Sequence, residues 1–130
     1  MATFEVERIP EFVTRENVNY LIRNGKNLLH ASIENLPNYK PLLEEIGDLY
    51  AIIKWVANGE KPEPPRPKYW MVRLSTKLKF KPYEAKSNHL RLYHFRGNDT
   101  GMILVFIGHK KDQKSDLQRL EQIIREYSNS

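Results

Sequence analysis

One six-residue segment constrains the fold of this 130-residue chain more than any other. Residues 102–107 read Met-Ile-Leu-Val-Phe-Ile, so the side chains are apolar at every position and not only at alternate ones. A strand with one face in water alternates apolar and polar residues, and a strand that is apolar on both faces belongs in the interior of a sheet. The segment is therefore predicted to be the middle strand of a sheet.

Two further strands are predicted on the N-terminal side of this segment. The turn Gly97-Asn-Asp-Thr-Gly101 joins residues 102–107 to a strand that begins near Leu90. Residues 72–81 alternate strictly, with apolar side chains at Val72, Leu74, Leu78 and Phe80 and basic ones at Arg73, Lys77, Lys79 and Lys81. This period of two predicts a half-buried strand with a basic outer face.

The N-terminal half predicts one strand and two helices. Residues 4–9 alternate and are closed by Pro10, as expected of a short strand. Thr14 is a candidate cap for a helix over 16–36, in which apolar residues recur at helical spacing. A second helix is expected over 39–58, with Gly59 just past its end. The short link between the two helices predicts an antiparallel helical hairpin.

The remaining segments complete the predicted architecture. The proline-rich residues 61–67 are expected to form an extended connector. Ser115-Asp-Leu-Gln118 has the pattern of a capping box for a C-terminal helix. The sequence thus predicts a single α+β domain over residues 1–130. It comprises a small antiparallel sheet with an N-terminal strand, a helical hairpin packed on one face, three further strands and a closing helix.

Charge is distributed unevenly along the chain. Residues 61–130 carry 15 Lys and Arg against 7 Asp and Glu, whereas residues 1–60 carry 6 against 9. Such asymmetry favours a polyanionic partner for the basic half, although a basic surface without a partner has the same composition. The absence of cysteine excludes disulfides and thiolate chemistry and fits a cytoplasmic protein. No apolar run approaches the ~20 residues of a membrane span, so no membrane association is expected.

Cations and aromatic residues gather in the basic half and define the candidate site. They are Lys77, Lys79, Lys81, Arg91, Tyr93, His109, Lys110, Lys111 and Lys114. We expect Lys79 and Arg91 to lie exposed on the concave face of the sheet, opposite the helical hairpin, and removal of Arg91 or Lys110 to leave folding nearly unaffected. Burial of Arg91 in an internal ion pair far from Lys79 would count against this site. Lysine and arginine bind phosphates, and tyrosine can stack on an unpaired base, a combination that suits single-stranded RNA. RNA cleavage needs only a base for the 2′-hydroxyl, cations for the phosphate and an acid for the leaving oxygen, so no metal or cofactor is expected.

Each of these residues also has a structural interpretation. Lysines such as Lys77, Lys79 and Lys81 protect an edge strand against aggregation, and His109 can be the polar end of a strand. A zinc site is not expected, because His89 and His94 lie on opposite faces of their strand. Trp55 lies off the apolar stripe of its helix and marks a candidate contact surface.

Two segments carry a resemblance to a known family. They are Leu90-Arg-Leu-Tyr-His-Phe95 and Ile103-Leu-Val-Phe-Ile-Gly-His-Lys-Lys-Asp-Gln-Lys114. The second resembles the motif of an apolar strand, a glycine, a lysine pair and Gln-Lys in the HigB-like, phage-derived branch of the RelE/ParE toxin superfamily. The similarity covers roughly residues 72–127.

The resemblance implies a RelE-like fold and a ribosome-dependent endoribonuclease from a type II toxin–antitoxin module. Its partners would be mRNA on the ribosome and a cognate antitoxin protein. By position, Lys79 and Lys81 match the family's paired lysines, Arg91 the arginine facing the scissile phosphate, and Lys110 the basic residue after the glycine. Some members carry a tyrosine where Asp116 stands here, which leaves the acid and base open. The superfamily also contains gyrase-poisoning members, so a module that binds nucleic acid or protein without strong catalysis is the alternative.

Overall fold

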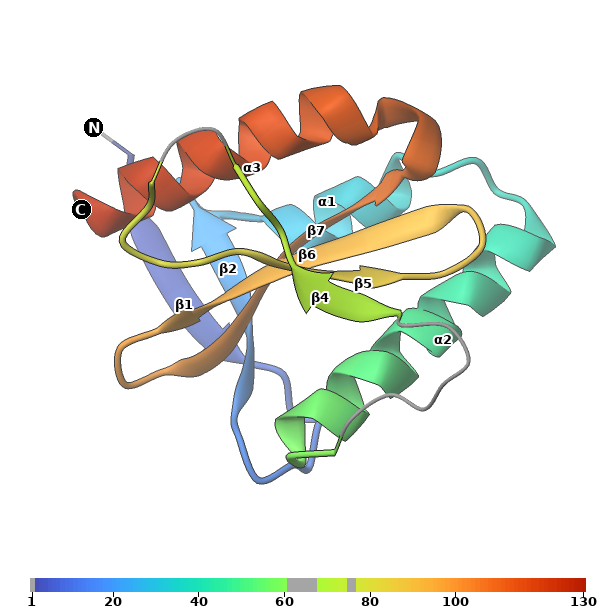
Figure 1. The fold of residues 1–130 in the computed structure, drawn as a ribbon, viewed down its shortest axis with the longest axis horizontal. Coiled ribbons are helices and arrows are strands. Elements are labelled where there is room, and N and C mark those ends of the chain that lie inside the picture. The colour runs from blue at the N-terminus through green and yellow to red at the C-terminus, as the bar shows by residue number, and fades with distance from the viewer. Residues whose placement is uncertain (1, 61–67, 75–76) are drawn as a thin grey trace.

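The computed structural model describes residues 2–60, 68–74 and 77–130, and these form an α+β fold (Figure 1). In chain order the elements are β1 (Phe4–Arg8), β2 (Val18–Arg23), β3 (Lys26–Asn27), α1 (Leu28–Glu34), α2 (Lys40–Ala57), β4 (Tyr69–Met71), β5 (Tyr83–Lys86), β6 (Leu90–Gly97), β7 (Gly101–His109), a 3₁₀ turn (Lys110–Asp112) and α3 (Gln113–Ser128). The prediction of an α+β fold is therefore confirmed.

The sheet has the order β1-β2-β7-β6-β5-β4, with β3 paired to β2. The all-apolar segment lies in β7, between β2 and β6, which confirms its predicted central position. β2 runs parallel to β7, while the other pairs are antiparallel. The expectation of a purely antiparallel sheet was wrong, because a second N-terminal strand joins it beside β7.

Helices cover both faces of the sheet. Leu29 of α1 and Leu49 of α2 belong to one core with Leu92 and Leu104, whereas Leu120 of α3 belongs to a second core on the other face. The pairing of β6 with β7 slips by one residue between Tyr93 and His94, as in a β-bulge. Both faces of β7 are buried, which explains why no polar residue occurs in residues 102–107.

The predicted helix over 16–36 was wrong in its first half. Residues 18–23 form β2, and only Leu28–Glu34 is helical. Asn24 and Gly25 have positive φ angles of 51° and 77° and connect β2 to β3. Asn-Gly is the preferred pair for a tight hairpin turn, and this signal outweighs the helical spacing of the apolar residues. The helical hairpin is thereby reduced to a short α1 and a long α2.

The strand predicted over 72–81 was also wrong for the residues that the structure describes. Residues 72–74 and 77–81 lie outside the strands, and β5 begins only at Tyr83. Lys77, Lys79 and Lys81 are nevertheless exposed, and Phe80 is buried. The alternating sequence pattern therefore predicts correctly which side chains are exposed. A segment can have this pattern of exposure without being hydrogen-bonded to a neighbouring strand. The proline connector over 61–67 falls outside the described residues.

The helix ends are set differently from the expected caps. Gly59 follows the end of α2 with a φ of 79°, as predicted. An Asn38 cap was also expected for α2 from its side chain, but the cap residue is Tyr39, which makes no side-chain hydrogen bond to the helix, and Pro41 lies in the first turn. The capping box at Ser115 was wrong, because α3 already begins at Gln113 and the Ser115 hydroxyl donates to the carbonyl of Asp112. No helix within the described residues is long and apolar enough to cross a bilayer.

Candidate functional site

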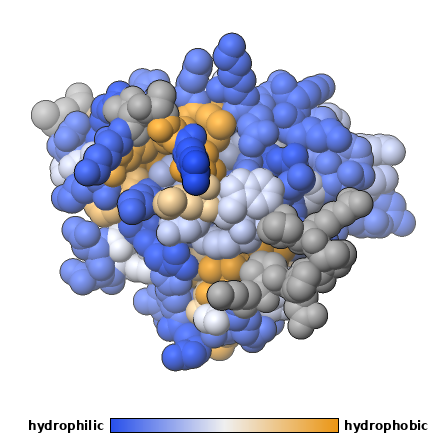
Figure 2. Space-filling view, viewed as in Figure 1, coloured by the Kyte–Doolittle hydropathy of each residue, from blue (hydrophilic) through white to orange (hydrophobic). Residues whose placement is uncertain are grey.

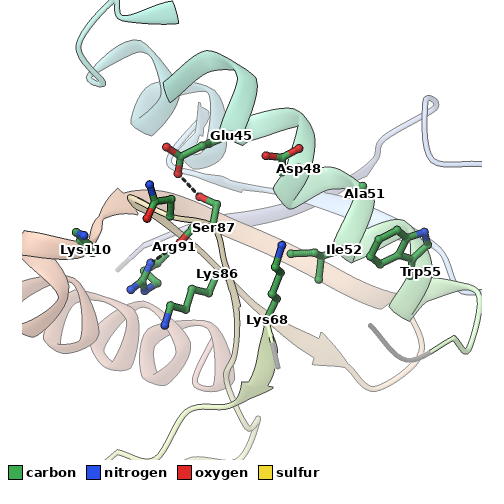
Figure 3. A pocket seen from close by; sticks show the side chains of 11 residues that line it. Glu45, Asp48, Ala51, Ile52, Trp55, Lys68, Lys86, Ser87, Arg91 and Lys110 are labelled. Atoms are coloured by element: carbon green, nitrogen blue, oxygen red, sulfur yellow. Dashed lines mark hydrogen bonds between the residues drawn. The ribbon is translucent and has the colours of Figure 1, made fainter. Parts of the chain in front are cut away.

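A cavity of about 620 Å³ separates α2 from the ends of β4, β5 and β6 (Figure 3). Its lining combines residues from four elements and their flanking loops: Glu45, Asp48, Ala51, Ile52, Trp55, Lys68, Lys86, Ser87, Asn88, Arg91 and Lys110. The volume lies in the usual range for small-ligand sites. Two of the predicted catalytic residues, Arg91 and Lys110, line the cavity, and Lys68 and Lys86 line it with them.

Arg91 is buried, although we expected it to lie exposed on an open face of the sheet. Its residue is only 8% exposed, because α3 covers the face of β6 on which it lies. Nη1 donates to the carbonyl oxygens of Ser87 at 3.0 Å and Leu90 at 2.9 Å, and Nε lies 3.7 Å from Glu84 Oε1. These contacts fix the guanidinium at the rim of the cavity.

Glu84 is the buried partner of this arginine. The residue is 1% exposed, and its carboxylate accepts a hydrogen bond of 2.5 Å from the Gln113 side chain. Burial raises the pKa of Glu84, and the nearby Arg91 only partly offsets that rise. An ion pair inside the fold therefore competes with any external anion for the positive charge of Arg91.

The wall formed by α2 begins at Glu45, which is hydrogen-bonded to the opposite side of the cavity. Its carboxylate accepts from the Ser87 hydroxyl at 2.5 Å, from the backbone N–H of His89 at 2.6 Å and from His89 Nδ1 at 2.7 Å. Burial raises the pKa of Glu45, but the hydrogen bonds from Ser87 and His89 outweigh it, so the pKa lies below its ordinary value. Glu45 is an anchor between α2 and the β5–β6 turn.

The cations of the cavity come from strand ends. The backbone N–H of Lys86 donates to the carbonyl of Lys68 at 2.8 Å, which places these two lysines side by side at the ends of β5 and β4. The backbone N–H of Lys110 donates to the carbonyl of His89 at 2.8 Å and so holds the start of the 3₁₀ turn against β6. Hydrophilic side chains predominate on the face shown in Figure 2, with apolar patches between them.

The paired lysines of the resemblance lie elsewhere. Lys79 lines a separate hollow of about 330 Å³ near Phe4 and Tyr127, and its ammonium group lies 5.3 Å from the ring centre of Phe80. Phe80 packs on Phe95, four residues along β6 from Arg91, a separation of about 13 Å along a strand. Lys81 and Lys77 are exposed and do not line the cavity. The structure thus separates these lysines from Arg91 and Lys110.

The other predicted RNA contacts divide into exposed and buried groups. Lys111 in the 3₁₀ turn and Lys114 in the first turn of α3 are exposed and lie outside the cavity. His109 caps the 3₁₀ turn by accepting from the Lys111 N–H at 3.2 Å, and burial together with the charge of Lys111 lowers its pKa. Tyr93 is fully buried beneath α3, so the expectation that its ring stacks on a base was wrong.

Sequence reasoning missed the α2 side of the cavity. Glu45, Asp48, Ile52 and Trp55 recur at helical spacing along one edge of the buried stripe of α2. Glu45 and Ile52 are buried, whereas Asp48 and Trp55 are exposed. In the sequence, only Trp55 indicated a functional surface on this helix, because it is a large aromatic residue outside the apolar stripe. Lys68 and Lys86 could not be identified as neighbours from the sequence, because only the pairing of β4 with β5 brings them together. Within the described residues no three His, Asp or Glu side chains are placed to hold a metal ion.

Comparison with known proteins identifies no relative: no protein-family model, curated protein or solved structure matches the chain. The resemblance to the RelE/ParE superfamily therefore rests on the residues quoted above. The functional argument rests on those residues and on the geometry of the cavity.

Proposed function

We propose that the chain is the toxin of a type II toxin–antitoxin module, a metal-independent endoribonuclease that cleaves mRNA by attack of a 2′-hydroxyl on the adjacent phosphate. The observation that carries the proposal is the cavity that Arg91 and Lys110 line together with Lys68 and Lys86. The same lining holds the carboxylates of Glu45 and Asp48, so four cationic residues outnumber two acidic ones. The excess of positive charge supports binding of a phosphodiester and of the extra negative charge that develops during cleavage.

The guanidinium of Arg91 is fixed at the rim of the cavity, although its Nε faces the buried carboxylate of Glu84. Two backbone carbonyls orient its Nη1, and among the described residues Nη2 has no hydrogen-bond acceptor. Lys110 and Lys86 are exposed and can move to meet phosphate oxygens. A rigid guanidinium beside mobile ammonium groups therefore suits a site that orients a phosphate and then neutralises it.

The remaining parts of the proposal follow from the family resemblance. An enzyme of this kind works on the ribosome, hence in the cytoplasm, and a cognate antitoxin silences it by covering the basic surface. Exposed Lys111, in the 3₁₀ turn, and Lys114, in the first turn of α3, would contact RNA outside the cavity. The lowered pKa of His109 favours the neutral imidazole, which is the form that can accept a proton as a general base.

One observation favours the alternative of a catalytically weak binding module. The ion pair with Glu84 neutralises much of the charge of Arg91, at an Nε–Oε1 distance of 3.7 Å. A cation that is already paired stabilises a transition state less than a free one. On this alternative the same cavity binds nucleic acid or a protein partner without efficient cleavage.

Cleavage of mRNA and growth arrest, measured for matched variants, test the proposal. Lys110→Ala removes an exposed cation, and Arg91→Met with Glu84→Gln removes the buried pair without leaving a lone charge. Each is expected to reduce cleavage by ~100-fold, while Lys26→Ala, an exposed lysine in the β2–β3 hairpin, retains full activity. Variants that fold and remain as toxic as the parent would refute the site. A parent that binds RNA but neither cuts mRNA nor arrests growth would support the alternative.

A further inference from the structure

A carboxylate and an imidazole form a pair at one end of the cavity, and phosphate binding does not account for them. Glu45 Oε2 lies 2.7 Å from His89 Nδ1, while Oε1 accepts from the Ser87 hydroxyl and from the backbone N–H of His89. The side chain of Glu45 is 10% exposed, whereas that of His89 is 40% exposed. A nearly buried carboxylate thus holds an imidazole that a ligand can reach.

The hydrogen bond from His89 to Glu45 fixes which ring nitrogen carries a proton. Burial raises the pKa of Glu45, but the hydrogen bonds from Ser87 and His89 outweigh it, so the carboxyl is ionised at neutral pH. An ionised carboxylate can only accept hydrogen bonds, so His89 Nδ1 is the donor. In the neutral ring Nε2 then has a free lone pair, and no described residue hydrogen-bonds to it. This is the arrangement that a general base requires.

His109 is the neighbouring imidazole, and its lone pair is already engaged. The ring centres of His89 and His109 lie 5.9 Å apart. His109 Nδ1 accepts the backbone N–H of Lys111 at 3.2 Å, so the neutral ring carries its proton on Nε2. That N–H can donate to a phosphate oxygen, but His109 would have to release Lys111 before it could accept a proton. Of the two adjacent rings, His89 is the one with a free lone pair.

Hydrogen bonds also connect His89 to the cations of the cavity. Its carbonyl oxygen accepts from the backbone N–H of Lys110 at 2.8 Å. Arg91 Nη1 donates to the carbonyl of Ser87, whose hydroxyl is bonded to Glu45. Glu45, Arg91 and Lys110 line the cavity together, and Figure 3 shows them at the same end of it. This end therefore combines phosphate-binding cations with an oriented imidazole.

We propose that His89 is the general base that removes the proton from the attacking 2′-hydroxyl, and that Glu45 positions its ring. The inference rests on the proposed function and names a catalytic residue for it. As the O2′–P bond forms, Nε2 takes the hydroxyl proton; the P–O5′ bond breaks, and the leaving oxygen takes a proton from water. The imidazolium returns its proton to the hydroxide that remains. The products are a 2′,3′-cyclic phosphate and a 5′-hydroxyl, and the ionised Glu45 stabilises the imidazolium while it exists.

Chemical rescue of mRNA cleavage tests the assignment of the base. His89→Ala should slow cleavage by ~100-fold or more. Added imidazole should restore cleavage in this variant, and methylimidazoles of higher basicity should restore it more strongly. Lys110→Ala has lost a cation and not a base, so imidazole should leave it slow. His30→Ala, a change at an exposed histidine of α1, should cut mRNA like the parent.

A double-mutant cycle tests the positioning role of Glu45. In Glu45→Gln the amide nitrogen can donate to Nδ1, which favours the tautomer with its proton on Nε2 and removes the free lone pair. Glu45→Gln should therefore slow cleavage by ~100-fold in the parent and cost nothing further in the His89→Ala background. If Glu45 acts only as an anchor between α2 and the β5–β6 turn, the two losses multiply, and the positioning role is wrong.

The outcomes separate this inference from the proposed function. If Lys110→Ala abolishes mRNA cleavage but His89→Ala cuts at the rate of the parent, the enzyme stands and the base is wrong. A slow His89→Ala protein that melts with the parent and does not respond to imidazole also overturns the base, because the ring then serves only as a contact. A parent that does not cut mRNA overturns the enzymatic proposal and this inference with it.

Discussion

Replacing Arg91 by methionine should destabilise the fold substantially, because Arg91 is a buried ion-pair partner as well as a candidate site residue. The side chain of Arg91 is 9% exposed and that of Glu84 is 2% exposed. Removing one member of a buried ion pair typically costs about 3–5 kcal/mol. The 3.7 Å separation and the remaining hydrogen bond from Gln113 to Glu84 place this case at the lower end, about 3 kcal/mol. For a chain of this length that loss lowers the melting temperature by about 10 °C.

The loss should depend on pH with a defined sign. Burial raises the pKa of Glu84 in the folded protein above its ordinary value. A carboxyl with a raised pKa makes its most favourable contribution to stability below the unfolded pKa, and stability falls as pH rises through the folded pKa. Removing Arg91 raises the folded pKa further. The gap in stability between the parent and Arg91→Met should therefore be small near pH 4 and widen toward pH 7.

Urea unfolding and thermal melts at pH 4.5 and pH 7.5 measure both effects. Glu84→Gln in the Arg91→Met background should recover most of the lost stability at pH 7.5, because no buried charge is then left alone. Arg8→Met, a change at an exposed arginine of β1, serves as the control and should melt with the parent. An Arg91→Met protein that melts within about 2 °C of the parent at pH 7.5 would show that Arg91 is not held in an internal pair.

Three further outcomes follow from close packing, turn geometry and charge. A Cβ at Gly108 would overlap the carboxylate of Asp116, so Gly108→Ala should lower the melting temperature, and adding Asp116→Ala to that variant should restore it. A Gly108→Ala protein that melts at the temperature of the parent would contradict this packing. Gly25 has a φ of 77° with open space around its Cβ position, so Gly25→Ala should cost about 1 kcal/mol in urea unfolding through backbone strain alone, and an unchanged midpoint would count against the turn. Lys110→Ala should reduce the slope of log affinity for RNA against log salt by about one, whereas Lys26→Ala should not; equal slopes would place Lys110 off the phosphate path.

The sequence predicted the centre of the sheet well and its edges poorly. The all-apolar run of β7 and the turn at Gly97–Gly101 predicted a hairpin whose second strand is central in the sheet. The structure shows this antiparallel β6–β7 hairpin. Val18, Leu21 and Ile22 fit a helix and a strand equally, and Asn24-Gly25 decides between them. Along residues 72–81 the alternation described burial, but pairing depends on where a partner strand lies, which local pattern does not contain.

The candidate site shows the same limit. Lys110 could be found from its position after a buried strand, and it lines the cavity. For Arg91, the sequence interpretation assumed that one face of β6 is open to solvent. It therefore predicted an exposed side chain that folding does not require. Packing of α3 on that face reverses the expectation. The cavity's α2 wall could be proposed only from the three-dimensional arrangement, since Asp48 and Trp55 look like ordinary surface positions of an amphipathic helix.

The ion pair of Arg91 and the proposed chemistry can be reconciled through competition. Glu84 is buried with a raised pKa, so its ionised form is poorly stabilised by its surroundings and depends on Arg91. A phosphate entering the cavity would share the guanidinium through Nη2, while Nη1 stays on the carbonyls of Ser87 and Leu90. If the phosphate draws the charge away, Glu84 becomes easier to protonate, and RNA binding should take up a proton near the folded pKa of this carboxyl. Calorimetric binding in two buffers of different ionisation enthalpy would detect that uptake, and Glu84→Gln should abolish it. RNA binding without proton uptake in the parent would mean that Arg91 keeps its internal partner and that the lysines alone meet the phosphate.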